Sequence, residues 1–224
     1  ILNFLTQNLI NKAYIIPNDF EETTLFRNPP ISPKALKKAK KIAVYNQYDF
    51  SKVLTANFLY NDKSLKKITL KNKKIITVEK NYRNSNPTNY NRILKAFSAI
   101  YNDLEYFPVA RGKNTKYWIG YEDGFYENRN FLGSYKHEGC DIMAEYNVSG
   151  YYPIVSVTDG IVENIGWLPK GGYRVGVRAN HGGYFYYAHL SKYTNIKKGD
   201  KIKAGTLIGY MGDTGYGKEG TTRK

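Results

Sequence analysis

The sequence predicts a mainly β, α+β protein, with an antiparallel sheet domain in its second half and an α+β extension in its first half. Three observations predict this fold. After residue 104, short apolar runs alternate with glycine-containing turns, which is typical of antiparallel strands. Just before them, one long stretch repeats apolar residues at helical spacing. The lysine-rich first half mixes both patterns. We therefore expect two domains, over residues 1–104 and 105–224.

Two shorter helices are predicted near the start of the chain. Residues 1–16 place apolar side chains at near-helical spacing, which predicts a short amphipathic helix. Further along, Ser32 is a suitable N-cap and Pro33 suits the first helical turn. A brief helix with a cationic face is therefore expected over residues 34–41, where lysines dominate.

The clearest helical pattern begins at Asn86, which can cap a helix, and Pro87, which suits its first turn. Its apolar residues recur at the i, i+3, i+4, i+7 spacing of one helix face. They are Tyr90, Ile93, Leu94, Phe97, Ile100, Tyr101 and Leu104. This stripe predicts a helix that packs against a sheet and ends before Pro108.

Strands are predicted on both sides of that helix. Residues 67–70 and 75–78 flank a polar stretch and predict a hairpin, within a strand region from Ile42 to Val78. In the second half the predicted strands are 117–120, 154–157, 160–163, 173–177 and 184–187. The strongest turn signals between them are Asp159-Gly160, Gly171-Gly172 and Gly182-Gly183.

The charge of the chain is strongly and unevenly positive. The net charge is +15, of which residues 1–112 contribute +11 from 19 Lys and Arg against 8 Asp and Glu. Such a surface fits anionic wall polymers or an anionic membrane surface, or is simply solvated. Because no nucleic-acid-binding module accompanies the charge, we expect no nucleic-acid partner. A single cysteine excludes an intrachain disulfide.

One stretch around residue 140 carries the residue types of a metal site. His137 and Asp141 are four residues apart, and an imidazole nitrogen and a carboxylate oxygen can share one zinc ion. If Asp141 begins a strand, the intervening residues form a tight loop, and Gly139 lets that loop fold back. The spacing alone also fits an exposed histidine in a polar turn.

The sequence further downstream favours the metal site. Tyr186-Tyr187-Ala188-His189-Leu190-Ser191 precedes a glycine-turned stretch from Lys198 to Gly209. Together with His137, Gly139 and Asp141, these motifs resemble the lysostaphin-type zinc metalloendopeptidases, which cleave peptide cross-links in bacterial cell walls. The resemblance covers roughly residues 105 to 224.

The resemblance implies an antiparallel sheet with a groove, zinc as cofactor, His137 and Asp141 as metal ligands, and His189 as a catalytic residue. His189 would orient or deprotonate the attacking water, or stabilise the oxyanion. The implied function is hydrolysis of peptide bonds in peptidoglycan. The family's final H-x-H does not occur before Lys224, so we expect the protein to continue beyond it and the chain as given to be inactive.

Three other residues near these motifs have side chains that could act in such a site. Cys140 lies between the predicted ligands, but neighbouring strand side chains point to opposite faces, so we expect it to be a small buried hydrophobe. His181 belongs to a turn at the far end of the strand that carries His189. Glu138 should be a carboxylate that faces solvent.

Two further classes of function remain open at this point. A non-catalytic relative could bind wall peptides or act as a scaffold. A sugar-phosphotransferase or biotinyl carrier would share the glycine-turned hairpins, but the modifiable His or Lys motifs are absent. The chain has no apolar run long enough to cross a bilayer. Since it starts at Ile1, we expect a removed signal peptide or membrane anchor and a location in the cell envelope or outside the cell.

Overall fold

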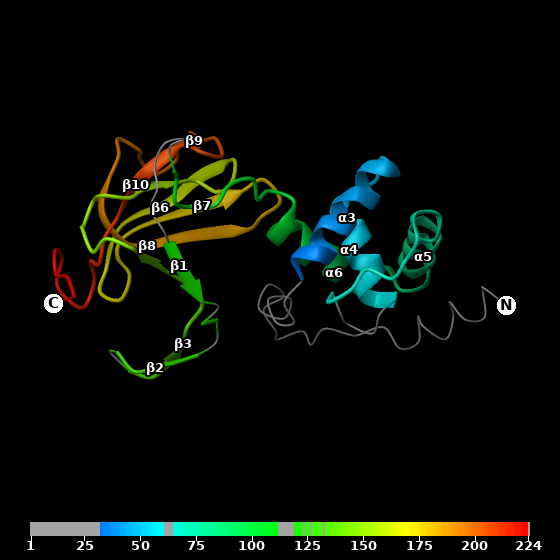
Figure 1. Cartoon of the computed structure of the whole chain (residues 1–224), viewed down its shortest axis with the longest axis horizontal. Coiled ribbons are helices and arrows are strands. Elements are labelled where there is room, and N and C mark those ends of the chain that lie inside the picture. Colours follow the sequence, from blue (N-terminus) through cyan, green and yellow to red (C-terminus); the bar gives the residue numbers. More distant parts are fainter. Residues whose placement is uncertain are drawn as a thin grey trace. The chain divides into compact units, whose positions relative to one another are not determined.

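The computed structural model describes residues 32–60, 65–111, 119–122, 124–125, 127–131 and 133–223 (Figure 1). The chain divides into two compact units, Ile1–Asp103 (unit 1) and Leu104–Lys224 (unit 2). The helix predicted over residues 1–16 lies outside the described residues. Among the described residues, no helix is long and apolar enough to cross a membrane.

The described part of unit 1 is helical. Its helices are α3 (Pro33–Tyr45), α4 (Phe50–Tyr60), α5 (Asn72–Ser85) and α6 (Pro87–Tyr101) (Figure 1). Their apolar faces form one core, in which the ring of Phe58 meets that of Phe97 edge-on at a centroid distance of 5.5 Å. Helices α3, α5 and α6 bury one face each, whereas α4 is buried along nearly its whole length.

Two predicted helix starts are confirmed in unit 1. The Ser32 side chain accepts a hydrogen bond from the backbone N–H of Ala35, and the Asn86 side chain accepts one from Asn89, each at 3.1 Å. These bonds satisfy backbone donors that a helix leaves unpaired at its start. Helix α3 is longer than predicted, and α6 ends at Tyr101, well before Pro108.

The strands predicted between Ile42 and Val78 are wrong. That region contains the end of α3, all of α4 and the first half of α5, and the predicted hairpin strand 75–78 lies within α5. The buried residues of α5 are Ile75, Glu79 and Tyr82. Their spacing of four and three residues follows a helix face rather than the two-residue period of a strand.

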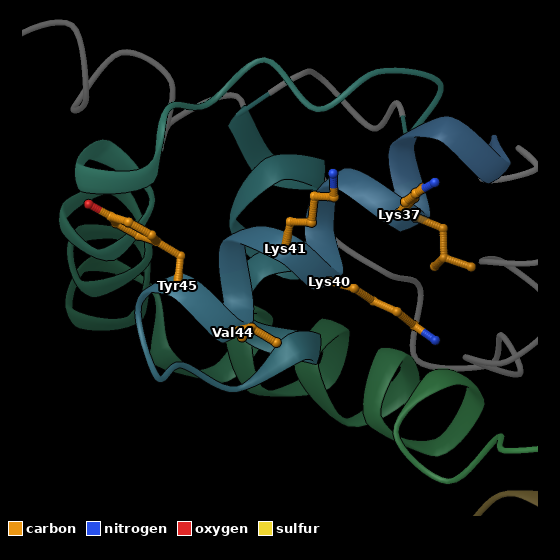
Figure 2. Close-up of a pocket in the computed structure, with 6 residues that line it drawn as sticks. Lys37, Lys40, Lys41, Val44 and Tyr45 are labelled. Carbon is orange, nitrogen blue, oxygen red and sulfur yellow. The ribbon is translucent and has the colours of Figure 1, made fainter.

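Helix α3 carries the most cationic exposed face of unit 1 that the structure describes. Lys37, Lys40 and Lys41 project from it next to Val44 and Tyr45 (Figure 2). Val44 is 80% exposed and Tyr45 is 68% exposed. The opposite side of the helix packs into the core through Ala35, Ala39, Ile42 and Ala43. The helix is therefore amphipathic, with lysines around an exposed apolar pair.

Unit 2 is built on antiparallel strands, as predicted. Its main sheet has the order β5-β10-β8-β7-β6-β9 (Figure 1). These strands are β5 (Pro153–Val155), β6 (Gly160–Leu168), β7 (Gly172–Ala179), β8 (Tyr184–Tyr193), β9 (Lys201–Ile202) and β10 (Leu207–Met211). Two smaller pairs accompany it: β1 (Ile119–Glu122) with β4 (Asp141–Ala144), and β2 (Asn128–Arg129) with β3 (Tyr135–Lys136).

The predicted turns have different outcomes. Gly171-Gly172 joins β6 to β7 and Gly182-Gly183 joins β7 to β8, as hairpins between neighbouring strands. Asp159-Gly160 is not a hairpin turn, because Gly160 begins β6 and the preceding strand β5 lies at the far side of the sheet. One face of the sheet packs around Val162, Val175, Val177, Tyr187 and Ile208, which are all buried.

Strand β8 is irregular at the point that matters for the site. Tyr187 pairs with Val175 and Leu190 with Tyr173, so three steps along β8 match two along β7. The extra residue makes a β-bulge, which re-aims side chains and increases local twist. Within this bulge His189 has a φ of 58°, in the left-handed region that few residues other than glycine adopt.

Candidate metal and catalytic site

The predicted metal ligands lie together at the start of β4. His137 follows β3, and Asp141 is the first residue of β4, as the sequence predicted. The side chain of His137 is 19% exposed and that of Asp141 is 54% exposed. Nε2 of His137 lies 3.4 Å from Oδ1 of Asp141. The pair is therefore accessible from solvent and close enough to act on one ion.

This separation provides a test of fit for zinc. Two ligand atoms at about 2.1 Å from a tetrahedral zinc lie about 3.4 Å from each other. The distance from His137 Nε2 to Asp141 Oδ1 is 3.4 Å. The donor set, one imidazole nitrogen and one carboxylate oxygen, is also one that zinc accepts. The two side chains present therefore fit zinc in both chemistry and spacing.

One contact of the His137 ring favours the tautomer in which Nε2 faces Asp141 with a lone pair. Nδ1 of His137 lies 3.1 Å from the carbonyl oxygen of Gly124, to which a protonated Nδ1 donates. In that tautomer Nε2 carries the lone pair that a metal needs. A Cβ at Gly139 would lie 3.4 Å from His137 Nε2. A side chain at residue 139 would therefore crowd the metal-facing edge of the ring.

Arg129, at the end of β2, contacts both predicted ligands. Its Nη2 donates to Oδ2 of Asp141 at 2.7 Å and lies 2.9 Å from Nδ1 of His137. Both contacts use atoms on the far side from the Nε2–Oδ1 pair. Because a guanidinium only donates, Arg129 and the Gly124 carbonyl compete for Nδ1. The tautomer suited to a metal leaves Arg129 paired with the carboxylates of Asp141, at 2.7 Å, and Glu127, at 3.8 Å.

The predicted catalytic residue, His189, is held in the β8 bulge. Its backbone N–H donates to the carbonyl of Gly171 at 2.7 Å, and its Nδ1 lies 2.6 Å from the carbonyl oxygen of Thr214. A carbonyl can only accept, so Nδ1 carries the proton. Nε2 is then left with a lone pair, as a general base requires.

The segment after β10 folds back onto His189. Gly172 has a φ of 62°, and a Cβ there would lie 2.3 Å from the Thr214 carbonyl oxygen, so only glycine allows this approach. The Thr214 hydroxyl donates to the carbonyl of Leu190 at 2.6 Å and accepts from the N–H of Tyr173 at 3.1 Å. Thr214 thus holds the acceptor of His189 between β7 and β8.

Aromatic contacts connect the His189 region with the β2–β3 segment. Tyr216 stacks on the His189 ring at a centroid distance of 5.9 Å, and Phe131 packs edge-on against Tyr216 at 5.1 Å. Lys170, next to the His189 partner Gly171, places its ammonium 3.9 Å from the ring centre of Tyr135 on β3. The segments that carry His189 and His137 therefore lie side by side in unit 2.

Cys140, Glu138 and His181 lie near the predicted site residues in the sequence, and the structure shows where each is placed. The prediction for Cys140 is wrong, because this cysteine is exposed. It lies just before β4, whose residues Ile142 and Ala144 pack against the unit 2 core while Asp141 and Met143 are exposed. Glu138 is exposed, as predicted. His181 lies in the β7–β8 turn, at the opposite end of β8 from His189.

Sequence reasoning missed Arg129, Thr214 and Tyr216. Arg129 precedes His137 by a hairpin whose pairing, Arg129 with Tyr135, was not predicted. Thr214 acts through its backbone carbonyl, which no sequence motif marks. Among the described residues no group of three or more His, Cys, Asp and Glu side chains is placed to hold a metal. The site thus contributes two ligands from this part of the chain.

Comparison with known proteins defines the class of this chain. Residues 135–222 match the model of Peptidase family M23. A solved structure from Ruminococcus gnavus, described as a glycyl-glycine endopeptidase LytM, is 38% identical, with a TM-score of 0.77. The match covers 98% of this chain and 83% of that one. The chain belongs to the M23 peptidase family, and the predicted lysostaphin-type resemblance is confirmed.

Two curated relatives are similar over part of their length. The L-Ala–D-Glu endopeptidase of Bacillus subtilis is 35% identical over 134 residues, which is 59% of this chain and 39% of that protein. The glycyl-glycine endopeptidase ALE-1 of Staphylococcus capitis is 33% identical over 113 residues, or 48% of this chain and 30% of that protein. The chain thus spans less than half the length of these relatives.

Proposed function

We propose that this chain belongs to a zinc-dependent endopeptidase that hydrolyses peptide bonds in bacterial peptidoglycan. The observation that carries the proposal is the 3.4 Å separation between His137 Nε2 and Asp141 Oδ1, which suits one tetrahedral zinc. Relatives named as endopeptidases of L-Ala–D-Glu and glycyl-glycine bonds support the substrate class. Because this substrate lies outside the cytoplasm, we also propose action in the cell envelope or outside the cell.

In this proposal His137 and Asp141 hold zinc, together with at least one ligand outside the described residues. Zinc, when bound, supplies Lewis-acid chemistry that activates water and polarises the scissile carbonyl. His189 contributes through Nε2, since Nδ1 is engaged with the Thr214 carbonyl. Thr214 and the stacked Tyr216 hold the ring in that tautomer and orientation, so Nε2 can take a proton from water and, once protonated, donate to the developing oxyanion.

The first test separates metal binding from chemistry in the full-length protein. We expect Asp141→Ala and His137→Ala to lose bound zinc and wall-digesting activity together. His189→Ala should keep zinc and lose activity by about 10²–10⁴-fold, the usual contribution of a general acid or base. His181→Ala is the matched control, since that histidine lies at the other end of β8. Metal analysis and release of peptides from purified sacculi are the two readouts.

Three results would contradict the proposal. Zinc retained by Asp141→Ala at the wild-type level would refute the ligand assignment. A full-length protein that binds sacculi but neither holds zinc nor releases peptides would be a non-catalytic wall-binding relative. Activity that persists with excess chelator in the wild type would likewise separate the hydrolysis from zinc.

A further inference from the structure

Strand β7 presents two arginines on the face opposite the core. Val175 and Val177 are fully buried in the core, so Arg174 and Arg178 alternate with them on the other side. Arg178 is fully engaged there. It donates to both carboxylate oxygens of Glu163, at 2.6 and 2.9 Å, and to the carbonyl of Gly182 at 2.9 Å.

Arg174 differs from Arg178 in having no such partner. Its side chain is half-buried, and its Nε and Nη1 are buried with no hydrogen-bond partner within the described part of the chain. Buried donors of a cation are costly when unpaired, because the water that solvated them has been removed. Native proteins leave few such groups, and water, an ion or a ligand normally pairs with them. Any such partner of Arg174 must be an acceptor, and an anion compensates the charge best.

The position of Arg174 in the sheet places it beside the candidate catalytic residue. It lies between Tyr173, which pairs with Leu190, and Val175, which pairs with Tyr187. The part of β8 opposite Arg174 is therefore the bulge that contains His189. The neighbouring Gly171 accepts a hydrogen bond from the His189 backbone N–H at 2.7 Å.

Tyr186 further locates the guanidinium. Burial raises the pKa of the Tyr186 phenol, and the positive charge of Arg174 opposes that rise. The phenol oxygen of Tyr186 is also next to Gly171, where it would lie 2.2 Å from an added Cβ. Tyr186 is 45% exposed. Arg174, Tyr186 and Gly171 therefore share the open face of the sheet near the His189 bulge.

We propose that Arg174 binds a carboxylate of the peptide substrate and makes the site selective for acidic peptides. The inference rests on the proposed function, because it concerns the same site. Of the two bond types cleaved by named relatives, L-Ala–D-Glu places an acidic residue at the cut and glycyl-glycine does not. A guanidinium binds a carboxylate through charge-assisted, often bidentate, hydrogen bonds, so Arg174 favours the acidic substrate.

The test uses two synthetic peptides that differ by one functional group, one containing L-Ala–D-Glu and the other L-Ala–D-Gln. Binding to the full-length protein is measured by calorimetry with a chelator present, so that no metal can bind the carboxylate. We expect the wild type to bind the acid about 10- to 100-fold more tightly than the amide, as one charged hydrogen-bonded pair allows. Arg174→Gln should bind both peptides like the amide.

Arg178→Gln is the matched control, because it removes an equal charge from the same strand face. We expect this variant to keep the preference for the acid. If Arg174→Gln fails to fold by circular dichroism, Arg174→Lys replaces it, and loss of the bidentate geometry should reduce the preference. Equal affinity of the wild type for both peptides would overturn the inference. So would a preference for the acid that persists unchanged in the folded Arg174 variant.

These outcomes are independent of the outcome for the proposed function, because binding is measured without cleavage. A protein that prefers the acid but does not hydrolyse it would support the role of Arg174 and refute the peptidase. A protein that binds both peptides with equal affinity and hydrolyses them would refute the role of Arg174 and support the peptidase.

Discussion

Arg129 holds the Asp141 carboxylate by one oxygen and leaves the other facing His137. The guanidinium donates to Oδ2 at 2.7 Å, while Oδ1 lies 3.4 Å from His137 Nε2. A free carboxylate rotates about its terminal torsion, which has broad minima. By fixing that torsion, Arg129 presents Oδ1 in the position a shared ion needs. Outer partners of this kind orient metal ligands and tune their affinity.

We therefore predict that Arg129→Gln lowers the zinc affinity of the full-length protein by about 10- to 100-fold, the usual effect of losing such a partner. Competition with a chromophoric chelator measures this affinity directly, without reference to activity. Lys136→Gln is the control, because it removes a neighbouring positive charge whose ammonium binds Asn128 at 2.6 Å. Unchanged zinc affinity in Arg129→Gln would mean that Asp141 is oriented without it.

For single residues, the sequence identifies side chains that belong to a local motif. It misses side chains that reach the site only through the pairing of two strands. His137 and Asp141 lie close together, as a shared ligand role would require, and β4 begins at Asp141; that they bind a metal stays a prediction. Arg129 reaches them only because β2 pairs with β3. Cys140 was misjudged because alternation says which face a residue takes but not whether anything covers that face. Cys140 lies just before β4 and is exposed, whereas Ile142 and Ala144 within the strand pack against the unit 2 core.

Among the elements, α5 shows why the N-terminal prediction failed. Its sequence is rich in isoleucine, threonine and valine, which favour strands, and begins with a polar stretch that resembles a turn. Such preferences are weak and packing overrides them. Ile75, Glu79 and Tyr82 all face the unit 1 core from α5. A buried glutamate at the centre of that face broke the apolar pattern that would have identified the helix.

Glu79 is fully buried and has three partners from three helices or their flanks. It accepts hydrogen bonds from the hydroxyls of Tyr48 and Tyr90, the latter at 2.5 Å, and pairs with Arg83 at 3.2 Å. Burial, with the carboxylate beside it, raises the pKa of Tyr90 far above its usual range. The same causes raise the pKa of Tyr48. Burial raises the pKa of Tyr82 to about 12.

These shifts predict that unit 1 loses stability at alkaline pH. A phenol with a raised pKa in the folded state contributes stability that is complete below its unfolded pKa, about 10. Above that pH the unfolded chain releases the proton while the folded chain keeps it. The free energy of unfolding then falls by at most about 1.4 kcal/mol per pH unit for each such tyrosine, until the folded pKa is passed.

Denaturant unfolding monitored at 222 nm between pH 9 and 11.5 measures this slope for unit 1, since the helices described in the chain lie there. Tyr90→Phe should reduce the slope by the share of one tyrosine and also lower stability at pH 7, because Glu79 loses a hydrogen bond. Tyr151→Phe, an exposed tyrosine of unit 2, is the control. A slope unaffected by Tyr90→Phe would contradict the assignment.

For the whole molecule, the division of charge suggests a division of labour. Residues 1–112 carry a net +11 of the total +15 and contain neither histidine nor cysteine. The exposed lysines of α3 are part of this excess (Figure 2). We propose that unit 1 contributes affinity for anionic wall polymers and no catalytic group. Such binding is electrostatic and should weaken as salt screens it.

This proposal predicts the effect of a triple substitution. Lys37→Gln, Lys40→Gln and Lys41→Gln together should reduce retention of the full-length protein on teichoic-acid-containing walls at low salt, with little difference left at 1 M salt. Zinc content and the bond cleaved should be unchanged. The control is the triple Lys197→Gln, Lys198→Gln and Lys201→Gln, which removes equal charge from an exposed part of unit 2. Equal losses of wall retention in both variants would mean that net charge alone, and not the lysines of α3 in particular, determines the binding.

The two halves differ in how far the sequence predicted their folds. Unit 2 was predicted well because glycine turns such as Gly171-Gly172 and Gly182-Gly183 fix the hairpins locally. Unit 1 has no such punctuation, and its helices are determined by a shared core whose members are far apart in sequence. Its effective local signals were the two helix caps, Ser32 and Asn86, and the apolar stripe of α6.

The bulge in β8 reverses the parity of the strand. Before it, Phe185 and Tyr187 point to the core at odd positions, while after it Leu190 does so at an even one. The positions that face the core therefore change from odd to even at His189, where the bulge lies. This shift places the polar ring of His189 next to the apolar layer that Tyr187 and Leu190 help to form. The backbone of His189 adopts the left-handed conformation, while Tyr187 and Leu190 on either side of it stay in the core.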